Sequence, residues 1–330
     1  MTTLKPQKVE AGEDGQRLDR WLKVRLPGIP HSILQKLLRT GQIRIDGKRA
    51  RGNTRIEAGQ EVRIPDVSPY VSEPSAPALR PPMGVSKADR AFIEGMILFE
   101  DDHVLVLNKP FGIAVQGGTK TSRHIDGLLA GMEDRFGGRA RLVHRLDRDT
   151  TGVLLVAKTR EAAARLGKLF QTRTVRKIYW AVVKGVPKPP QGKVEAALVK
   201  TSGPEGDRVR KAGPGEQDVA QRAVTHYAVI DRTLGAAWVS LKPVTGRQHQ
   251  LRAHMAVIGT PILGDQKYDG DKGLPEGIEA KLHLHARRLV LPHPKGGIID
   301  VTAPLPAHMA RTFDALGFDS NRYDIGYDYA

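Results

Sequence analysis

A run of six prolines between residues 65 and 82 constrains the folding of this 330-residue chain more than any other feature. Proline fixes its own φ angle and lacks an N–H donor, so a segment this rich in proline forms neither a regular helix nor a paired strand. We predict a stiff, extended linker over residues 66–95. The chain should then contain a small domain at residues 14–65, a larger domain at 96–310 and a tail at 311–330.

The charge of the chain points to a polyanionic partner. There are 52 lysines and arginines against 36 aspartates and glutamates, a net charge of +16, and residues 1–65 alone carry 14 cations and 7 anions. Nucleic acid is the preferred partner, because an anionic membrane would require a basic amphipathic anchor helix and none is evident. The alternative is a soluble basic protein that has no such partner.

The composition also limits location and chemistry. No stretch approaches the roughly 18 consecutive apolar residues of a membrane span, and the first residues lack the apolar core of a signal peptide. The absence of cysteine excludes disulfides, thiolate nucleophiles and cysteine-ligated zinc. We expect a cytoplasmic protein without membrane association, and a monomer.

The N-terminal block reads as two short helices followed by short strands. Four apolar residues from Leu18 to Leu26 share one helical face, with Asp14 placed to start that helix, and a second helix covers residues 31–39 and ends at Gly41. Strands follow near residues 43–45 and 62–64, with a turn at Asp46-Gly47. Cations of this block should face outward, among them Arg17, Arg20, Lys36, Arg39, Arg44 and Lys48.

This arrangement resembles the RNA-binding module first described in ribosomal protein S-four, and the core of that module is similar to LLRTGQIRIDGKRA at residues 37–50. The resemblance implies that the six cations contact RNA. The alternative interpretation is that they only solvate a small domain.

The larger domain is predicted to contain more strands than helices. Apolar runs and alternation indicate strands at residues 97–100, 104–108, 153–157, 178–183, 224–230 and 237–241, and helical spacing covers residues 160–172 and 248–258. Helices do not alternate strictly with strands, so the fold class is α+β with a mixed, largely antiparallel sheet.

Several familiar motifs are missing from the sequence. There is no phosphate-binding loop, no dinucleotide-binding glycine pattern and no nucleophile elbow. His249 and His254 are five residues apart, and His283 and His285 are two apart, so neither pair has the spacing of a His-Glu-x-x-His zinc site. We expect no metal and no cofactor, and histidines that make structural hydrogen bonds or phosphate contacts.

The segment LVHRLDRDTTG at residues 142–152 stands apart from the rest of the chain. Opposite charges from Arg145 and Arg148 favour an ionised carboxylate between them, which a nucleophilic aspartate requires at neutral pH. An ion-pair cluster with a structural role is equally compatible with these residues. Charge and position do not choose between Asp147 and Asp149.

A resemblance does choose between them. HRLDRDTTG is similar to the signature of the pseudouridine synthases that act on the ribosomal large subunit, in which the aspartate is the nucleophile, and Asp147 occupies that position. Thr151 stands where the family usually has serine. Three other stretches are similar to family motifs in the expected order: EDDHVLVLNKPFGIAVQGG, KIYWAVVKG with Tyr179, and LKPVTGRQHQLRAHMAVIGTPILGDQKY with Leu251 and Arg252.

The resemblance covers roughly residues 97–305 and implies the fold of these synthases and an isomerase acting on large-subunit (23S) ribosomal RNA. It implies that Asp147 attacks the flipped uridine, with Arg252 paired to it. Tyr179 would stack on the uracil, Leu251 would wall the pocket, and Arg145 would fill the space left by the base. Other possibilities are the same chemistry on transfer RNA or small-subunit RNA, a non-catalytic RNA-binding or ribosome-assembly protein, and a basic metal-dependent hydrolase.

Overall fold

The structure is a computed structural model that describes residues 6–70, 85–118, 121–172, 174–203, 206–269 and 273–321. Its contacts divide the chain into two units, Met1–Pro81 and Pro82–Ala330. The division falls inside the predicted linker, most of whose prolines lie outside the described residues. Each unit is described by itself.

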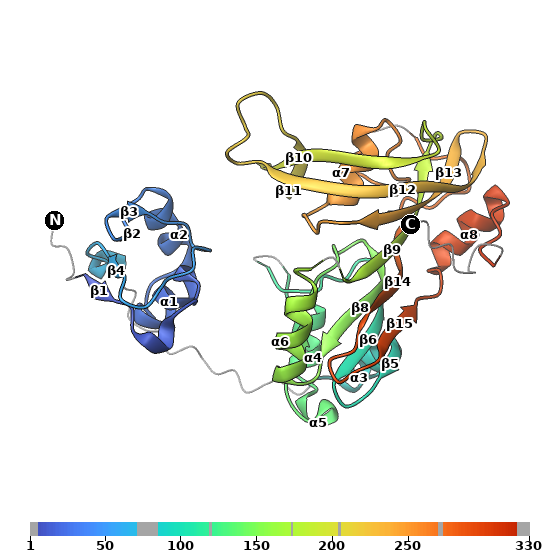
Figure 1. Cartoon of the computed structure of the whole chain (residues 1–330). Coiled ribbons are helices and arrows are strands. Elements are labelled where there is room, and N and C mark those ends of the chain that lie inside the picture. The colour runs from blue at the N-terminus through green and yellow to red at the C-terminus, as the bar shows by residue number, and fades with distance from the viewer. Residues whose placement is uncertain are drawn as a thin grey trace. The chain divides into compact units, whose positions relative to one another are not determined.

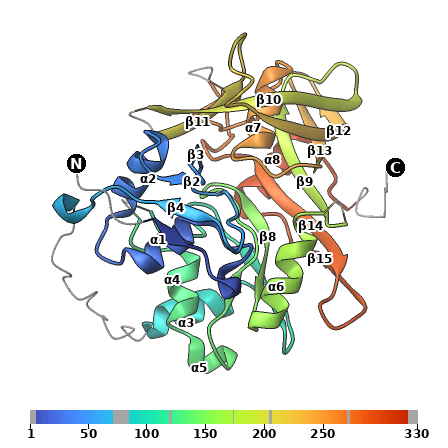
Figure 2. The same cartoon turned by 60° about the vertical axis from the view of Figure 1, so that its left-hand side comes forward.

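The small unit packs two helices against a four-stranded sheet with strand order β1-β4-β2-β3 (Figure 2). Its buried core is apolar and includes Leu18, Trp21 and Leu22 from the first helix and Leu34 and Leu37 from the second. The elements are β1 (Gln7–Lys8), a 3-10 helix (Ala11–Glu13), α1 (Leu18–Arg25), α2 (His31–Arg39), β2 (Arg44–Ile45), β3 (Lys48–Arg49), β4 (Glu61–Arg63) and a 3-10 helix (Ser68–Tyr70).

The second helix has the predicted limits, but the start predicted for the first helix is wrong. Helix α1 begins after Arg17 and not at Asp14. The Asp14 carboxylate instead accepts a hydrogen bond from the Ala58 N–H at 3.0 Å. Gly15 follows with a φ of +72°, which interrupts any helical path from Asp14.

The large unit is built on one 11-stranded sheet with the order β11-β10-β12-β13-β9-β14-β8-β6-β5, to which β15 adds beside β14 and β7 beside β8. Its strands are β5 (Ile97–Glu100), β6 (Val104–Lys109), β7 (Arg141–Leu142), β8 (Thr151–Ala157), β9 (Arg176–Lys184), β10 (Gln191–Gly203), β11 (Gly206–Lys211), β12 (Gln221–Thr233), β13 (Ala236–Pro243), β14 (Leu284–Pro292) and β15 (Ile298–Thr302). Its helices are α3 (Lys87–Glu94), α4 (Ile125–Ala130), α5 (Glu133–Phe136), α6 (Arg160–Leu169), α7 (Gln250–Val257) and α8 (Ala307–Leu316).

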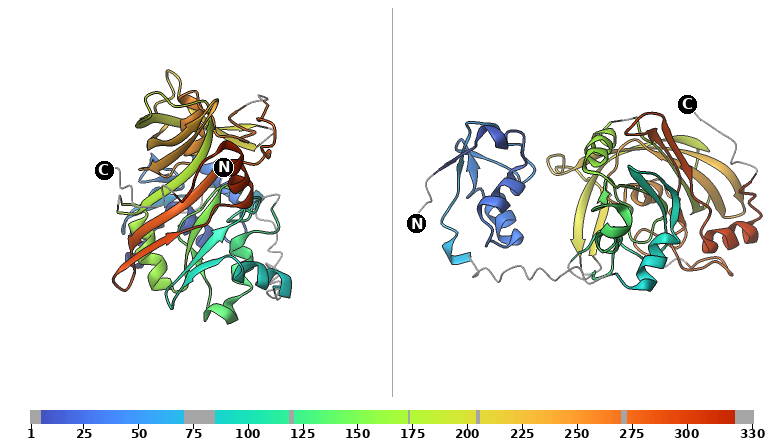
Figure 3. Two further views of the ribbon diagram at one scale, coloured as in Figure 1. Left: turned by 90° about the vertical axis from the view of Figure 1, so that its right-hand side faces the viewer. Right: turned by 90° about the horizontal axis from the view of Figure 1, so that it is seen from below.

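The sheet is mixed and mainly antiparallel. Strands β8 and β14 pair in parallel, whereas the other strand pairs found among the described residues are antiparallel. The strands turn progressively along the sheet, from the long β10–β12 ribbon to β5 (Figures 1 and 3). The predicted α+β class with a largely antiparallel sheet is confirmed.

Helices cover both faces of the sheet because side chains alternate along its strands. On β6, Leu105 and Leu107 contact the cluster that contains α3, α4 and α5, whereas Val104 and Val106 contact the cluster that contains α6. The same division recurs farther along the sheet, where α7 packs with Ala181 and Val183 of β9 and α8 packs with their neighbours on that strand. The centre of the sheet is therefore fixed from both sides.

Two predicted boundaries need correction. The predicted linker at 66–95 contains α3, which is capped by Ser86 and buries Ile93 in the core of the large unit. The predicted tail begins inside α8, and Phe313 and Phe318 pack against Trp238. Proline content dominated the first prediction and acidic composition the second, and neither reports on which apolar side chains are buried. Residues 322–330 of the tail lie outside the described residues.

The helices of the described ranges are all too short or too polar for a membrane span. None of them is both long and apolar enough to cross a bilayer.

Candidate active site

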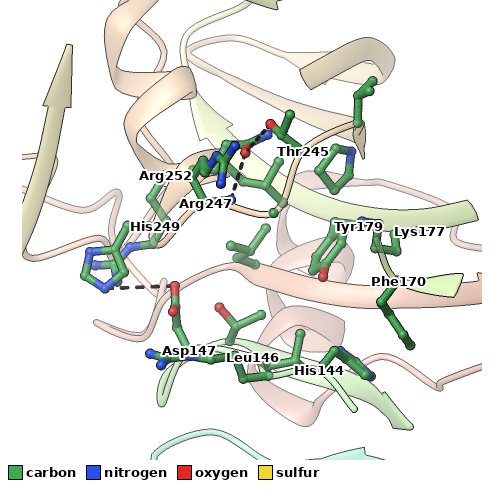
Figure 4. A pocket seen from close by; sticks show the side chains of 18 of the residues that line it. His144, Leu146, Asp147, Phe170, Lys177, Tyr179, Thr245, Arg247, His249 and Arg252 are labelled. Atoms are coloured by element: carbon green, nitrogen blue, oxygen red, sulfur yellow. Dashed lines mark hydrogen bonds and ion pairs between the residues drawn. The ribbon is translucent and has the colours of Figure 1, made fainter. Parts of the chain in front are cut away.

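A cavity of about 620 Å³ lies where the loop before β8, the middle of β9 and the start of α7 meet (Figure 4). Its lining includes all five residues predicted for the site, Arg145, Asp147, Tyr179, Leu251 and Arg252. These residues are up to 107 positions apart in the sequence, and the sheet brings them together. The arrangement supports their assignment to one site, and their roles remain predictions.

The loop that carries Asp147 is held by hydrogen bonds from the buried Lys109. The Lys109 ammonium is fully buried and donates hydrogen bonds to the carbonyl oxygens of Pro110, Ile113 and Arg148, each within 2.9 Å. The Gly112 N–H donates to the same Arg148 oxygen at 3.1 Å. The Lys-Pro-x-Gly turn thus fixes the backbone one residue after Asp147.

The Thr151-Gly152 pair fixes the other side of this loop. Gly152 has a φ of +105°, and a Cβ atom there would lie 2.2 Å from the Ala286 oxygen. This close approach allows β8 to pair in parallel with β14. The Thr151 hydroxyl lies 2.8 Å from Nδ1 of buried His285, so the threonine that replaces the usual serine has a hydrogen-bonding role.

Asp147 and Asp149 lie in different surroundings. Asp147 lines the cavity, its side chain is 22% exposed, and its Oδ2 is 4.0 Å from Nε2 of His249. Asp149 is not part of the cavity lining and pairs with the exposed Arg148 at 3.5 Å. The geometry therefore favours Asp147 as the reactive carboxylate.

The predicted pairing of Arg252 with Asp147 is wrong in this structure. Arg252 forms a bidentate ion pair with Asp265, at 2.8 and 2.6 Å, and both side chains are buried. Asp265 takes this place because its own loop folds back on α7, where its Oδ1 also accepts the Lys267 N–H. Arg252 nevertheless interacts electrostatically with Asp147. Burial lowers the pKa of Arg252, but the charges of Asp265 and Asp147 outweigh this effect and raise it.

Tyr179 lies half-buried on β9 and faces the cavity beside Lys177 (Figure 4). Burial, with a smaller contribution from the charge of Asp147, raises the pKa of its hydroxyl, so the phenol stays protonated at neutral pH. The aromatic ring offers a face to a base, and the hydroxyl offers a donor or acceptor.

Three further residues that line the cavity, Leu251, Arg145 and His144, differ in burial and charge. Leu251 is buried and packs in the core between α7 and β9, as expected of a wall residue. Arg145 is exposed. The ring of His144 stacks on Phe170 with centroids 4.6 Å apart, and burial lowers the pKa of His144 to about 3, so it is neutral.

Comparison with known proteins identifies the family of this chain. Residues 103–257 match the family model of RNA pseudouridylate synthase, and residues 16–62 match the S4 domain. The chain is 38% identical to ribosomal large subunit pseudouridine synthase C of Salmonella typhi, over 93% of this chain and 95% of that protein. The corresponding protein of Vibrio cholerae is 37% identical over 94% of this chain and 96% of its own length.

The chain belongs to the RNA pseudouridine synthase family. Among solved structures, human RNA pseudouridylate synthase domain containing 4 is 32% identical, with a TM-score of 0.60 over 70% of this chain and 96% of that one. The predicted family, the predicted isomerase class and the predicted RNA-binding module are confirmed.

Sequence reasoning missed several residues of this synthase site. His249, Asp265 and Tyr268 all lie within the third family-like stretch, from which only Leu251 and Arg252 were predicted to belong to the site. His249 was considered only as a zinc ligand. Lys109 lies in the first stretch, directly after the strand predicted at residues 104–108, and no role was predicted for it. These polar residues could have been found from the sequence, because they lie within stretches that were already recognised as similar to family motifs.

The other histidines behave as predicted for structural residues. His254, His283 and His285 are buried and hydrogen-bonded, for example His254 Nδ1 to Thr225 Oγ1 at 2.9 Å. No group of three or more metal-binding side chains occurs within the described ranges.

A second, basic cavity of about 430 Å³ adjoins the first and shares Lys177, Arg222, Pro243 and Val244 with it. Strand pairing between β9 and β13 ends at Tyr179 and Leu241, although both strands continue, so the sheet opens at this point. Besides the shared cations, the lining contains Arg176, Lys193 and Lys242. A synthase can use such a groove for the phosphates of its RNA substrate.

In the small unit all six predicted RNA-binding cations are exposed. They differ in their contacts within the protein. Arg17 pairs with Asp19, and Arg44 donates to the carbonyl oxygens of Gly41 and Gly47, so both also stabilise the fold. Arg20, Lys36, Arg39 and Lys48 form no ion pair with a carboxylate in the described part of this unit.

Proposed function

We propose that this chain converts specific uridines to pseudouridines in large-subunit ribosomal RNA, with Asp147 as the nucleophile. The observation that carries the proposal is the meeting of Asp147, Tyr179 and Arg252 at one cavity of a pseudouridine synthase fold. The names of the relatives, which are large-subunit synthases matched along almost their whole length, support the substrate.

The reaction moves uracil from a nitrogen-linked to a carbon-linked glycosidic bond within one nucleotide. Asp147 either attacks the anomeric carbon and displaces N1 of the uracil, or removes a sugar proton as the N1 bond breaks. The detached base turns and its ring carbon C5 bonds to the anomeric carbon, while the bond to Asp147 breaks or the proton returns to the sugar. C5 then loses its proton and N1 takes one up. Tyr179 stacks on the uracil, and its protonated hydroxyl assists proton removal at the new bond as a hydrogen-bonding group and not as a phenolate base. The reaction has no net oxidation or addition, so the proposal includes no cofactor or metal.

The remaining residues act on the shape and charge of the site. Arg252, held by Asp265, places a fixed cation near Asp147. Leu251 walls the pocket, and Arg145 occupies the space that the flipped base leaves. The exposed cations of the small unit add affinity through phosphate contacts. We further propose that a cytoplasmic monomer is sufficient for activity.

The substrate is tested by incubating the purified chain, in EDTA, with unmodified transcripts of large-subunit RNA, small-subunit RNA and transfer RNA. Pseudouridine is then mapped at single-nucleotide resolution. New pseudouridines confined to large-subunit RNA support the proposal, and sites only in transfer RNA overturn its substrate but not its chemistry. Loss of activity in EDTA would indicate a metal-dependent reaction instead.

A further inference from the structure

His249 occupies a strained position at the start of α7, directly beside the proposed nucleophile. Its backbone has φ +49° and ψ +20°, in the left-handed region that residues other than glycine rarely adopt. Asp46 is the other non-glycine residue with a positive φ within the described residues, and it lies in a tight turn. Strain of this kind persists where the surrounding contacts fix it, and it is concentrated at functional sites.

Two hydrogen bonds determine the orientation of the His249 ring. The Val209 N–H donates to the Tyr268 hydroxyl oxygen at 2.8 Å, and that hydroxyl lies 3.1 Å from His249 Nδ1. Burial raises the pKa of Tyr268 to about 12, so its O–H keeps the proton. Because the oxygen already accepts from Val209, the O–H is available to donate to Nδ1.

An imidazole that accepts at Nδ1 carries its own proton on Nε2. The pKa of His249 lies below its ordinary value, chiefly because the ring is buried; Arg252 and Lys267 act in the same direction, and Asp147 and Asp265 act against it. The ring is therefore neutral near pH 7. Its Nε2–H faces Oδ2 of Asp147 at 4.0 Å (Figure 4).

We propose that His249 is a positioning residue that donates its Nε2–H to Oδ2 of Asp147 when RNA enters the site. A closure of about 1 Å brings the two atoms to hydrogen-bonding distance, and such contacts commonly tighten only in the substrate complex. With Oδ2 held in this way, the carboxylate presents Oδ1 to the ribose of the target nucleotide. The inference rests on the proposed role of Asp147.

Three variants of the full-length chain test it on large-subunit RNA transcript. His249→Asn keeps a residue that tolerates the left-handed backbone, but its amide is too short to reach Asp147. His249→Gln restores an N–H donor with a longer reach. Tyr268→Phe keeps the ring that lies 5.1 Å from the Arg252 guanidinium but removes the hydroxyl that fixes the His249 tautomer.

Single-turnover rate, RNA affinity and melting temperature are measured for each variant, with Asp147→Ala as the reference. We expect His249→Asn to slow the reaction about 10- to 100-fold with RNA affinity changed less than about twofold. His249→Gln should recover at least part of that loss, and Tyr268→Phe should show an intermediate rate.

Wild-type rates in both His249→Asn and Tyr268→Phe would overturn the inference. So would rate losses that only follow losses of RNA affinity or melting temperature. If His249→Asn does not fold, the rate of Tyr268→Phe decides alone. Activity in Asp147→Ala would show that the proposed nucleophile is wrong, which is a separate failure from that of His249.

Discussion

At the scale of single residues, Arg252 of the site is held by Asp265, which is not one of the residues proposed to react. The Arg252–Asp265 pair is buried, with side-chain exposures of 6% and 0%. Removing one member of such a pair leaves an uncompensated charge in a region of low dielectric constant. We therefore expect Asp265 to affect the site through Arg252, although Asp265 is not part of the cavity lining.

We expect Asp265→Asn to lower the free energy of unfolding by about 3–5 kcal/mol and to reduce activity, because Arg252 loses both its counter-charge and its orientation. Arg288–Asp300 is the matched control, since it is also bidentate but lies at the surface with exposures of 35% and 41%. Asp300→Asn should cost less than about 1 kcal/mol. Urea unfolding measures both, and equal costs would contradict the account.

The sequence identified residues that line the cavity, but it did not identify the contacts that hold them. Asp147 belongs to a local signature, so it could be found without a structure. The partner of Arg252 lies 13 positions away in a loop, and only the tertiary fold places it there. The family resemblance implied that Arg252 pairs with Asp147, whereas the partner of Arg252 in the structure is the buried Asp265.

At the scale of elements, the start of β8 positions the loop of Asp147, the proposed nucleophile, through a close contact with β14. The Gly152 backbone lies so near Ala286 that no side chain fits, and its positive φ would strain any other residue. The close contact and the positive φ both constrain the backbone of β8, the strand that follows the Asp147 loop.

Gly152→Ala should destabilise the chain by about 3 kcal/mol or more, because overpacking and backbone strain both contribute. Gly167→Ala serves as its control, since Gly167 lies within α6 and an added Cβ atom would meet no neighbouring atom within 4 Å. That change should be neutral or stabilise by up to about 1 kcal/mol. Similar thermal shifts in the two variants would show that the contact with β14 is unimportant.

Elements with strong apolar patterns were predicted well, and elements formed through distant pairing were missed. The helix at residues 31–39 and the strand at 97–100 have the predicted bounds. Strand β10 alternates buried Val194 and Ala196 with exposed neighbours, but glycine and small residues weaken that alternation in the sequence. Its pairing with β12 and β11 gives it a stability that local pattern does not reveal.

At the scale of the whole molecule, the net charge of +16 should make RNA binding strongly dependent on salt. Lys36→Gln combined with Arg39→Gln removes two exposed cations of the small unit. We expect the slope of log affinity against log salt to decrease by about 0.7 for each lost phosphate contact.

RNA affinity is measured between about 50 and 200 mM salt, the range over which phosphate contacts have a large effect. Lys295→Gln is a control, because Lys295 is exposed but pairs with Glu161 at 3.1 Å. An unchanged slope in the double variant would mean that this surface of the small unit does not contact phosphate.

Buried histidines give the large unit a predictable response to acid. Burial lowers the pKa of His144 and His285 to about 3, and that of His254 and His283 to about 4, from an ordinary value of 6.5. Above pH 6.5 both the folded and the unfolded chain hold these rings neutral, so their stability contribution is complete. Below pH 6.5 these histidines take up protons in the unfolded chain but not in the folded chain, so the free energy of unfolding falls.

We therefore expect the urea midpoint to decrease steadily between pH 7 and pH 4.5. Carboxylates whose pKa is lowered, such as Glu13 and Glu279 at about 2, add to the loss mainly below their ordinary value of 4.5. A midpoint that is constant over this range would contradict the burial of His254, His283 and His285.

The most direct test of the account is the rate of pseudouridine formation by Asp147→Asn, which keeps the size of the side chain and removes its charge. The full-length variant is compared with wild type on large-subunit RNA transcript, and RNA affinity is measured in parallel. We predict that no pseudouridine forms while RNA affinity stays within about twofold of wild type, because phosphate contacts dominate binding. Pseudouridine formation at a rate near that of wild type would show that another group performs the attack.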